Sequence, residues 1–221
     1  MSRILVPSAG PDSWRAFLAK PELHWATGNS ARTLAYAWEA SDGIPPEVLA
    51  ILTPVVGEVE PLIVVPEHKT PLPGGRRESQ ADVFLLARHS QGTIACTIEG
   101  KVDEPFGPTV GQQIAGASDG RKARLAFLCE KLGLAACPDD VRYQLLHRSV
   151  SALIEADRFC SADAAMIFHS FSPDLRWFDA FAAFVELLGG TAVPGEPIVI
   201  EGLERRLILG WACGDQHFRS L

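Results

Sequence analysis

The segment from residue 82 to residue 102 constrains the fold most, because it has the pattern of two strands joined by a short loop. Residues 82–88 form an apolar run that is bulky enough for a buried strand. The link His89-Ser90-Gln91-Gly92 has the polarity and the glycine of a hairpin loop. An antiparallel pairing with residues 93–102 places Asp82, at the start of one strand, beside Glu99, near the end of the other.

The second strand has two distinct faces. Ile94, Cys96 and Ile98 share one face, because side chains two residues apart on a strand point the same way. Glu99 and Lys101 share the opposite face. The hairpin therefore predicts two carboxylates and one ammonium group at the same end of a sheet.

This combination of charges suits metal-dependent hydrolysis of a phosphodiester. We expect Asp82 and Glu99 to bind Mg²⁺ or Mn²⁺, since hard cations prefer oxygen ligands, with the backbone carbonyl of Gly100 as a further ligand. Lys101 would orient or deprotonate the attacking water and neutralise charge in the transition state. Glu39, on a predicted helix over 31–40, would add a carboxylate if that helix packs against the same end of the sheet.

The order of the predicted elements indicates a mixed α/β sheet covered by helices. No shift in composition marks a second domain, so we expect residues 1–221 to form one. The remaining predicted elements are helices over 45–52, 121–132, 141–157 and 175–188, strands over 61–65, 164–171, 197–200 and 206–211, and a loop over 66–80.

The arrangement Asp82…Glu99-Gly100-Lys101, behind a helix with Glu39 and ahead of a helix and one more strand, resembles the PD-(D/E)xK nuclease-like superfamily. The resemblance implies a restriction-endonuclease-like fold whose αβββαβ core covers about residues 30–188, with a C-terminal strand extension over about 189–221. It also implies cleavage of nucleic acid, which we expect to be DNA in preference to RNA. The sequence departs from the motif at Ala81, where proline often precedes the aspartate.

A second resemblance covers residues 143–148. This segment is similar to the Tyr-Gln-Leu-Leu helix of bacterial restriction-endonuclease-like proteins. A glutamine on that helix often faces the substrate, so the resemblance makes Gln144 a substrate-binding candidate, together with Tyr143 and Arg148. Many members of such folds cut duplexes as dimers, which leaves a homodimer open.

The composition limits the classes of partner. A net charge of −7 counts against binding of duplex DNA by a basic surface over the whole protein. The basic side chains of the segments 74–77 and 120–124 either bind phosphates or simply point into solvent from a loop and a helix start. No apolar run approaches the roughly 18–20 residues of a membrane span. Five cysteines without a Cys-x-x-Cys pair favour reduced thiols in a cytoplasmic protein.

The sequence also agrees with rival interpretations. Glu99 and Lys101 are also compatible with an ion pair on a solvated sheet face. The acidic balance favours a second hypothesis, in which the nuclease-like fold is a catalytically inactive binding or regulatory module. A third hypothesis is a metal-dependent hydrolase of a small phosphoester.

Overall fold

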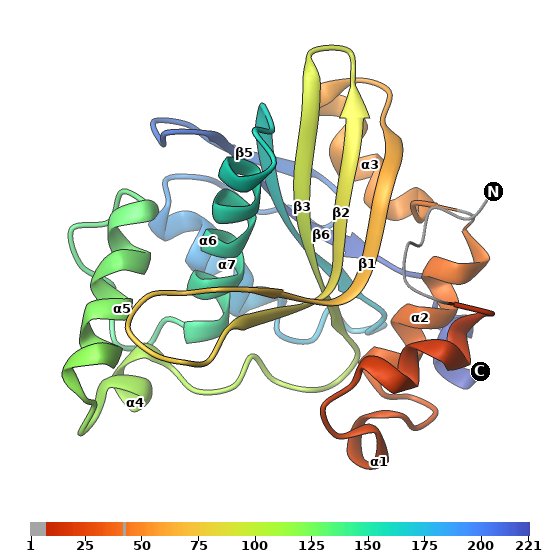
Figure 1. Ribbon diagram of the computed structural model, residues 1–221, viewed down its shortest axis with the longest axis horizontal. Coiled ribbons are helices and arrows are strands. Elements are labelled where there is room, and N and C mark those ends of the chain that lie inside the picture. The colour runs from red at the N-terminus through yellow and green to blue at the C-terminus, as the bar shows by residue number, and fades with distance from the viewer. Residues whose placement is uncertain (1–7, 42) are drawn as a thin grey trace.

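The computed structural model describes residues 8–41 and 43–221, and within these residues the central element is a six-stranded mixed sheet in the order β1-β2-β3-β4-β6-β5 (Figure 1). The strands are β1 Glu60–Thr70, β2 Ser79–His89, β3 Gly92–Lys101, β4 Asp163–Ser170, β5 Pro197–Ile200 and β6 Arg206–Cys213. The helices are α1 Pro21–His24, α2 Ser30–Ala40, α3 Pro46–Val56, α4 Val110–Ile114, α5 Asp119–Lys131, α6 Tyr143–Arg158 and α7 Phe178–Leu187, with 3-10 turns η1 Pro11–Phe17 and η2 Gln216–Ser220.

The predicted hairpin is confirmed. Strands β2 and β3 pair antiparallel, with Val83 opposite Ile98 and His89 opposite Gly92. Gly92 has a φ of 146°, a conformation that a residue with a Cβ rarely adopts. The glycine in the predicted loop therefore closes the hairpin.

The other half of the sheet is largely parallel. Strand β4 pairs parallel with both β3 and β6, while β5 pairs antiparallel with β6. Parallel neighbours need a crossover connection, which α4, α5 and α6 supply between β3 and β4. The expected class, an α/β fold with a mixed sheet flanked by helices, is confirmed.

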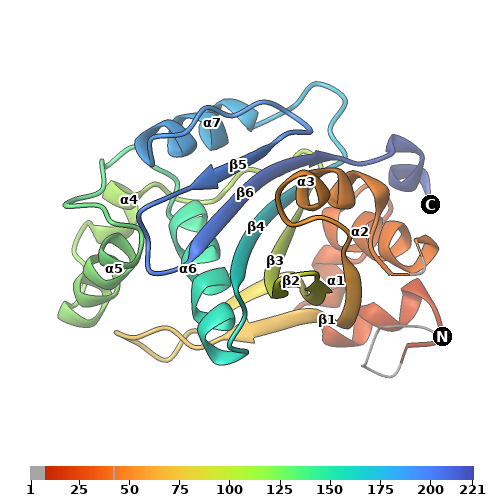
Figure 2. The same ribbon diagram turned by 90° about the horizontal axis from the view of Figure 1, so that it is seen from above.

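Helices cover both faces of the sheet, as Figure 2 shows. Val83 and Leu85 pack with α2 and α3 on one face, whereas Phe84 packs with α6 and α7 on the other. The alternation along each strand thus divides the apolar side chains between two layers of helix.

Two predicted boundaries were wrong. The strand expected at 61–65 runs over Glu60–Thr70, so the connection to β2 is shorter than the predicted loop over 66–80. Pro66 does not end this strand, because β1 lies at the edge of the sheet, where a missing N–H is tolerated. Helix α7 begins at Phe178 and not at Leu175, since Leu175 and Trp177 both have left-handed backbone conformations.

The helices expected near 31–40, 45–52, 121–132 and 141–157 are present as α2, α3, α5 and α6. The short elements η1, α1, α4 and η2 were not predicted. Over residues 8–41 and 43–221, none of the helices combines the length and the apolar character that a membrane crossing requires.

The contact between α3 and β6 gives a test of the packing. A Cβ added at Gly210 of β6 would lie 2.4 Å from Cγ2 of Ile51 on α3. Gly210→Ala should therefore lower the free energy of unfolding by about 1–3 kcal/mol through overpacking. Urea denaturation measures this change. Ile51→Ala removes the Cγ2 that the added Cβ would meet, so the double variant should lose less unfolding free energy than the two single variants lose together. An unfolding free energy equal to that of the wild type would contradict the packing described.

Candidate active site

Three carboxylates lie in one row across the first three strands. Pro66 pairs with Val83 and His68 pairs with Ala81, so the register places Glu67 opposite Asp82. The β2–β3 register, continued by one residue beyond Val83 and Ile98, places Asp82 opposite Glu99. The extended register agrees with the predicted placement of Asp82 beside Glu99, and Glu67 on β1 continues the row.

Asp82 is bound to the end of β3 through the backbone. Its Oδ2 accepts a hydrogen bond from the Gly100 N–H at 2.7 Å. There is little room for a side chain at position 100, because a Cβ added to Gly100 would lie 3.3 Å from Leu34 of α2 and 3.4 Å from Oδ2 of Asp82. Burial, followed by the negative charges of Glu99 and Glu67, raises the pKa of Asp82 well above its usual range.

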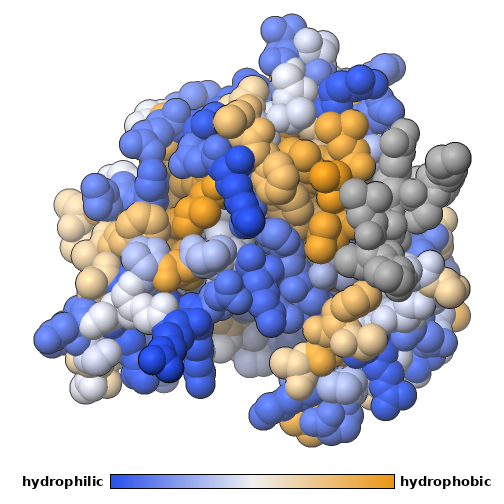
Figure 3. All heavy atoms as spheres, viewed as in Figure 1, coloured by the Kyte–Doolittle hydropathy of each residue, from blue (hydrophilic) through white to orange (hydrophobic). Residues whose placement is uncertain are grey.

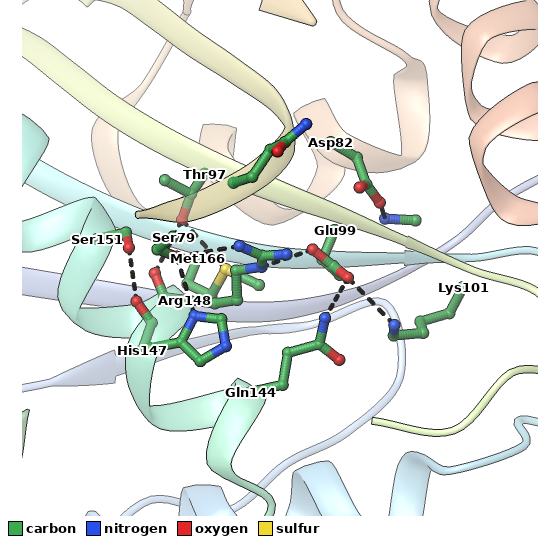
Figure 4. A network of polar contacts seen from close by, with 12 residues as sticks. Ser79, Asp82, Thr97, Glu99, Lys101, Gln144, His147, Arg148, Ser151 and Met166 are labelled. Atoms are coloured by element: carbon green, nitrogen blue, oxygen red, sulfur yellow. Dashed lines mark hydrogen bonds and ion pairs between the residues drawn. The ribbon is translucent and has the colours of Figure 1, made fainter. Parts of the chain in front are cut away.

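Glu99 is buried and has three side-chain donors (Figure 4). Lys101 Nζ lies 3.2 Å from Oε1, Gln144 Nε2 donates to Oε1 at 2.5 Å, and Arg148 Nε donates to Oε2 at 2.7 Å. Burial acts to raise the pKa of Glu99, but the charges of Arg148 and Lys101 outweigh it and the pKa is lowered. Glu99 is thus an ionised carboxylate whose negative charge is compensated by the Lys101 and Arg148 side chains.

Lys101 and Arg148 are themselves buried, so the Glu99–Lys101 pair does not lie on a solvated face. Nζ of Lys101 lies 5.3 Å from the centroid of the Phe106 ring, a cation–π contact. Arg148 Nη1 donates to Ser79 Oγ at 3.0 Å, which ties α6 to β2 as well as to β3. With Nε and Nη1 both engaged inside the protein, Arg148 positions Glu99.

Two cavities lie on either side of Arg148. The first, of about 450 Å³, is lined by Glu67, Asp82 and Arg148, and by residues at the start of α2. The second, of about 310 Å³, is lined by Lys101, Gln144 and Arg148, together with Tyr143 and His147. The predicted site residues are therefore divided, with Asp82 in one cavity and Lys101, Tyr143 and Gln144 in the other.

Two more residues of α6, Tyr143 and His147, have shifted pKa values. Burial, together with the charges of Arg148, Arg124 and Lys101, lowers the pKa of His147 well below its usual range. Its Nδ1 lies 2.9 Å from Ser79 Oγ. The pKa of the half-buried Tyr143 is raised by burial. His147 is therefore neutral at physiological pH, and it adds no charge beside Lys101.

Glu39 of α2 has other partners. Its Oε1 accepts hydrogen bonds from Trp14 Nε1 at 2.7 Å and from Ser8 Oγ at 2.5 Å. Among the contacts of residues 8–41 and 43–221, none joins this carboxylate to Asp82 or Glu99. A metal-ligand role for Glu39, like that for the Gly100 carbonyl, stays a prediction.

Sequence reasoning missed Glu67. Burial and the charge of Glu99 raise the pKa of Glu67 to about 7, against the lowering effect of the hydrogen bond from Gln80. The predicted loop over 66–80 contains Glu67, because Pro66 follows directly on the apolar run 61–65. The available signal was the alternation of Ile63, Val65 and Glu67, which continues one face of β1.

The donor set agrees in kind with a hard divalent cation. Asp82, Glu99 and Glu67 offer carboxylate oxygens, and the pKa values of Asp82 and Glu67 are raised by burial first and by the neighbouring negative charges second. Within the part of the chain that the structure describes, no cluster of three or more His, Cys, Asp or Glu side chains is arranged to hold a metal ion.

The chain was compared with known protein families. Residues 7–216 match the model of a family described as a domain of unknown function, DUF6946. The chain belongs to this family. No curated protein and no solved structure matches it. The row of carboxylates thus lies within the part of the chain that the family model covers.

The protonation of Glu67 predicts a pH dependence of stability. The folded pKa of about 7 exceeds the ordinary value of 4.5, so the associated stability is present below about pH 4.5 and is lost as the pH rises through 7. The unfolding free energy of the wild type should therefore fall as the pH is raised from about 5 to about 8. In Glu67→Gln this fall should be smaller by about 2–3 kcal/mol.

Urea denaturation at the two pH values provides the measurement. Glu58→Gln, which removes an exposed carboxylate just before β1, is the matched control and should follow the wild type. If Glu67→Gln has the same pH dependence as the wild type, Glu67 does not hold its proton in the way described.

Proposed function

We propose that this protein is a Mg²⁺- or Mn²⁺-dependent phosphodiesterase that cleaves DNA, with a restriction-endonuclease-like fold. The observation that supports this most directly is the position of Glu99. The Glu99 carboxylate lies 3.2 Å from the Lys101 ammonium group and in one row with Asp82. Asp82 accepts a hydrogen bond from the N–H of Gly100, the residue between Glu99 and Lys101 in the sequence. A carboxylate, a second carboxylate and a lysine at the end of a β-hairpin are the groups that such hydrolysis uses.

The order of elements supports the fold part of the proposal. Helix α2, the strands β1, β2 and β3, helix α6 and strand β4 follow one another in the αβββαβ order that the resemblance implies. Helices α3, α4 and α5 are additions to this order, while β5 and β6 correspond to the predicted C-terminal extension. The candidate residues lie on β2, β3 and α6, where such a core would place them.

Each residue has a separate task in the proposal. Asp82 and Glu99 would hold the cation, which supplies charge stabilisation at the phosphate and a more acidic water when bound. A Mg²⁺ ion commonly binds one or two carboxylates and keeps several waters or substrate oxygens, which agrees with the small number of side-chain ligands here. Lys101 would donate to a phosphate oxygen or orient the attacking water, from the wall of the second cavity.

The α6 residues hold these groups in place. Gln144 and Arg148 fix the two oxygens of Glu99 from one helix, so the carboxylate is oriented before substrate arrives. Tyr143 and Gln144 line the cavity beside Lys101, which is where a bound strand would contact them.

One observation favours the alternative of an inactive module. Glu99 already has three internal donors, an arrangement that also stabilises a fold without any metal. Calorimetric titration with Mg²⁺ or Mn²⁺ separates the two functions. Binding that Asp82→Asn abolishes supports the enzyme, whereas no binding to the intact protein supports the module.

The proposal predicts cleavage of DNA that depends on a divalent metal. Lys101→Ala and Glu99→Gln should each lower the rate about 10²–10⁴-fold, because each removes a group that acts in the transition state. Gel analysis of labelled DNA with Mg²⁺ or Mn²⁺, and with a chelator, measures the rate.

Arg88→Ala is the matched control, because Arg88 is an exposed cation at the hairpin end of β2 and should leave the rate unchanged. Circular dichroism establishes that each variant folds, and Asp82→Asn gives a second test outside the buried ion pair. Activity that survives both Lys101→Ala and Glu99→Gln, or that needs no metal, would reject the proposal.

A further inference from the structure

The loop between β1 and β2 is held against the start of α5. Arg124 Nε donates to the Pro73 carbonyl at 2.7 Å, and its Nη2 donates to the Leu72 carbonyl at 3.3 Å. The two backbones approach closely, since a Cβ added at Gly74 would lie 2.1 Å from the Gly120 carbonyl oxygen. Figure 1 shows this loop reaching across to α5.

This contact brings two basic segments together that are far apart in the sequence. Arg76 and Arg77 follow Gly74 in the loop, and Arg121 and Lys122 follow Gly120 on α5, and all four side chains are exposed. We call these four residues and Arg124 the basic track. The exposed acidic side chains of the same segments are Glu78 and Asp119. In Figure 3 strongly hydrophilic residues lie among white and pale orange ones in the area where Figure 1 draws this loop and the first turns of α5.

The basic track continues towards the candidate active site. The Arg124 guanidinium lies near the side chains of Tyr143 and His147, where its charge acts to lower the pKa of each. Tyr143 and His147 line the cavity that also contains Lys101. Positive groups therefore run from the loop, over α5, to the lysine beside Glu99.

We infer that the basic track binds the phosphodiester backbone of DNA and directs it into the cavity beside Lys101. Exposed cations in a row attract a polyanion even on a protein whose net charge is −7, because the local potential governs the contact. A strand of nucleic acid can follow the track into a recessed cavity, which the flat surface of a lipid bilayer cannot do. The path to Lys101 rests on the proposed function, but binding to the track does not.

Fluorescence anisotropy tests the inference with a labelled DNA duplex of about 20 base pairs, in the presence of EDTA so that no cleavage occurs. We expect Arg76→Ala/Arg77→Ala and Arg121→Ala/Lys122→Ala each to raise the Kd about tenfold or more. Each pair should also reduce the slope of log Kd against log salt concentration by about 1–2, because contacts to phosphates are lost.

Arg88→Ala/Arg158→Ala is the matched control. It removes the same charge from exposed positions at the hairpin end of the sheet, away from the end that contains Glu99 and Lys101, and should leave the Kd within about twofold of the wild type. The track side chains are exposed, and thermal melting establishes that each variant remains folded. Arg124 is left unchanged because it holds the loop.

The outcomes separate this inference from the proposed function. Weaker DNA binding of the track variants, in a protein that cleaves nothing, would support the track and reject the nuclease. Binding that is equal in the track variants and the control would overturn the track, whatever the cleavage assay gives. No binding of DNA by the wild type, or track-dependent binding to phosphatidylserine vesicles in place of DNA, would also overturn it.

Discussion

The buried charge of Glu99 is the constraint on which the rest of the site depends. A carboxylate removed from water needs paired cations and hydrogen bonds, and losing one partner of such a pair costs about 3–5 kcal/mol. Arg148 and Gln144 meet this need from α6, and Lys101 meets it from the same strand. The charge on β3 therefore holds α6 in place, and α6 contributes Arg148 to both cavities and most of its first turns to the second one.

The carboxylates of the row differ in how they are neutralised. Glu99 has two cations beside it and stays ionised, whereas Asp82 and Glu67 have raised pKa values because burial and the neighbouring negative charges act against ionisation. The cavity on one side of Arg148 thus contains the carboxylates of Asp82 and Glu67, which a proton or a cation would stabilise. The cavity on the other side contains Lys101. This asymmetry across Arg148 is the physical basis of the proposed hydrolysis, in which charge of both signs acts on one phosphate.

Local alternation was enough to predict the hairpin and the shared face of Glu99 and Lys101, because both follow from the two-residue period of a strand. The same reasoning failed at Pro66, since only the sheet order shows that β1 is an edge strand, and Glu67 was missed with it. The partners of Glu99 on α6 depend on how the helix packs, and the meeting of the two basic segments depends on the close approach of Gly74 and Gly120. Such contacts join residues distant in sequence, where periodicity gives no information.

The central claim is that Asp82 and Glu99 share a cation, and anomalous diffraction from crystals soaked in Mn²⁺ tests it most directly. The account predicts an anomalous peak within coordination distance of carboxylate oxygens of both residues, about 2.0–2.6 Å, and loss of that peak in Asp82→Asn. Glu99 still paired with Lys101 and Arg148, with no peak beside Asp82 at millimolar Mn²⁺, would contradict it.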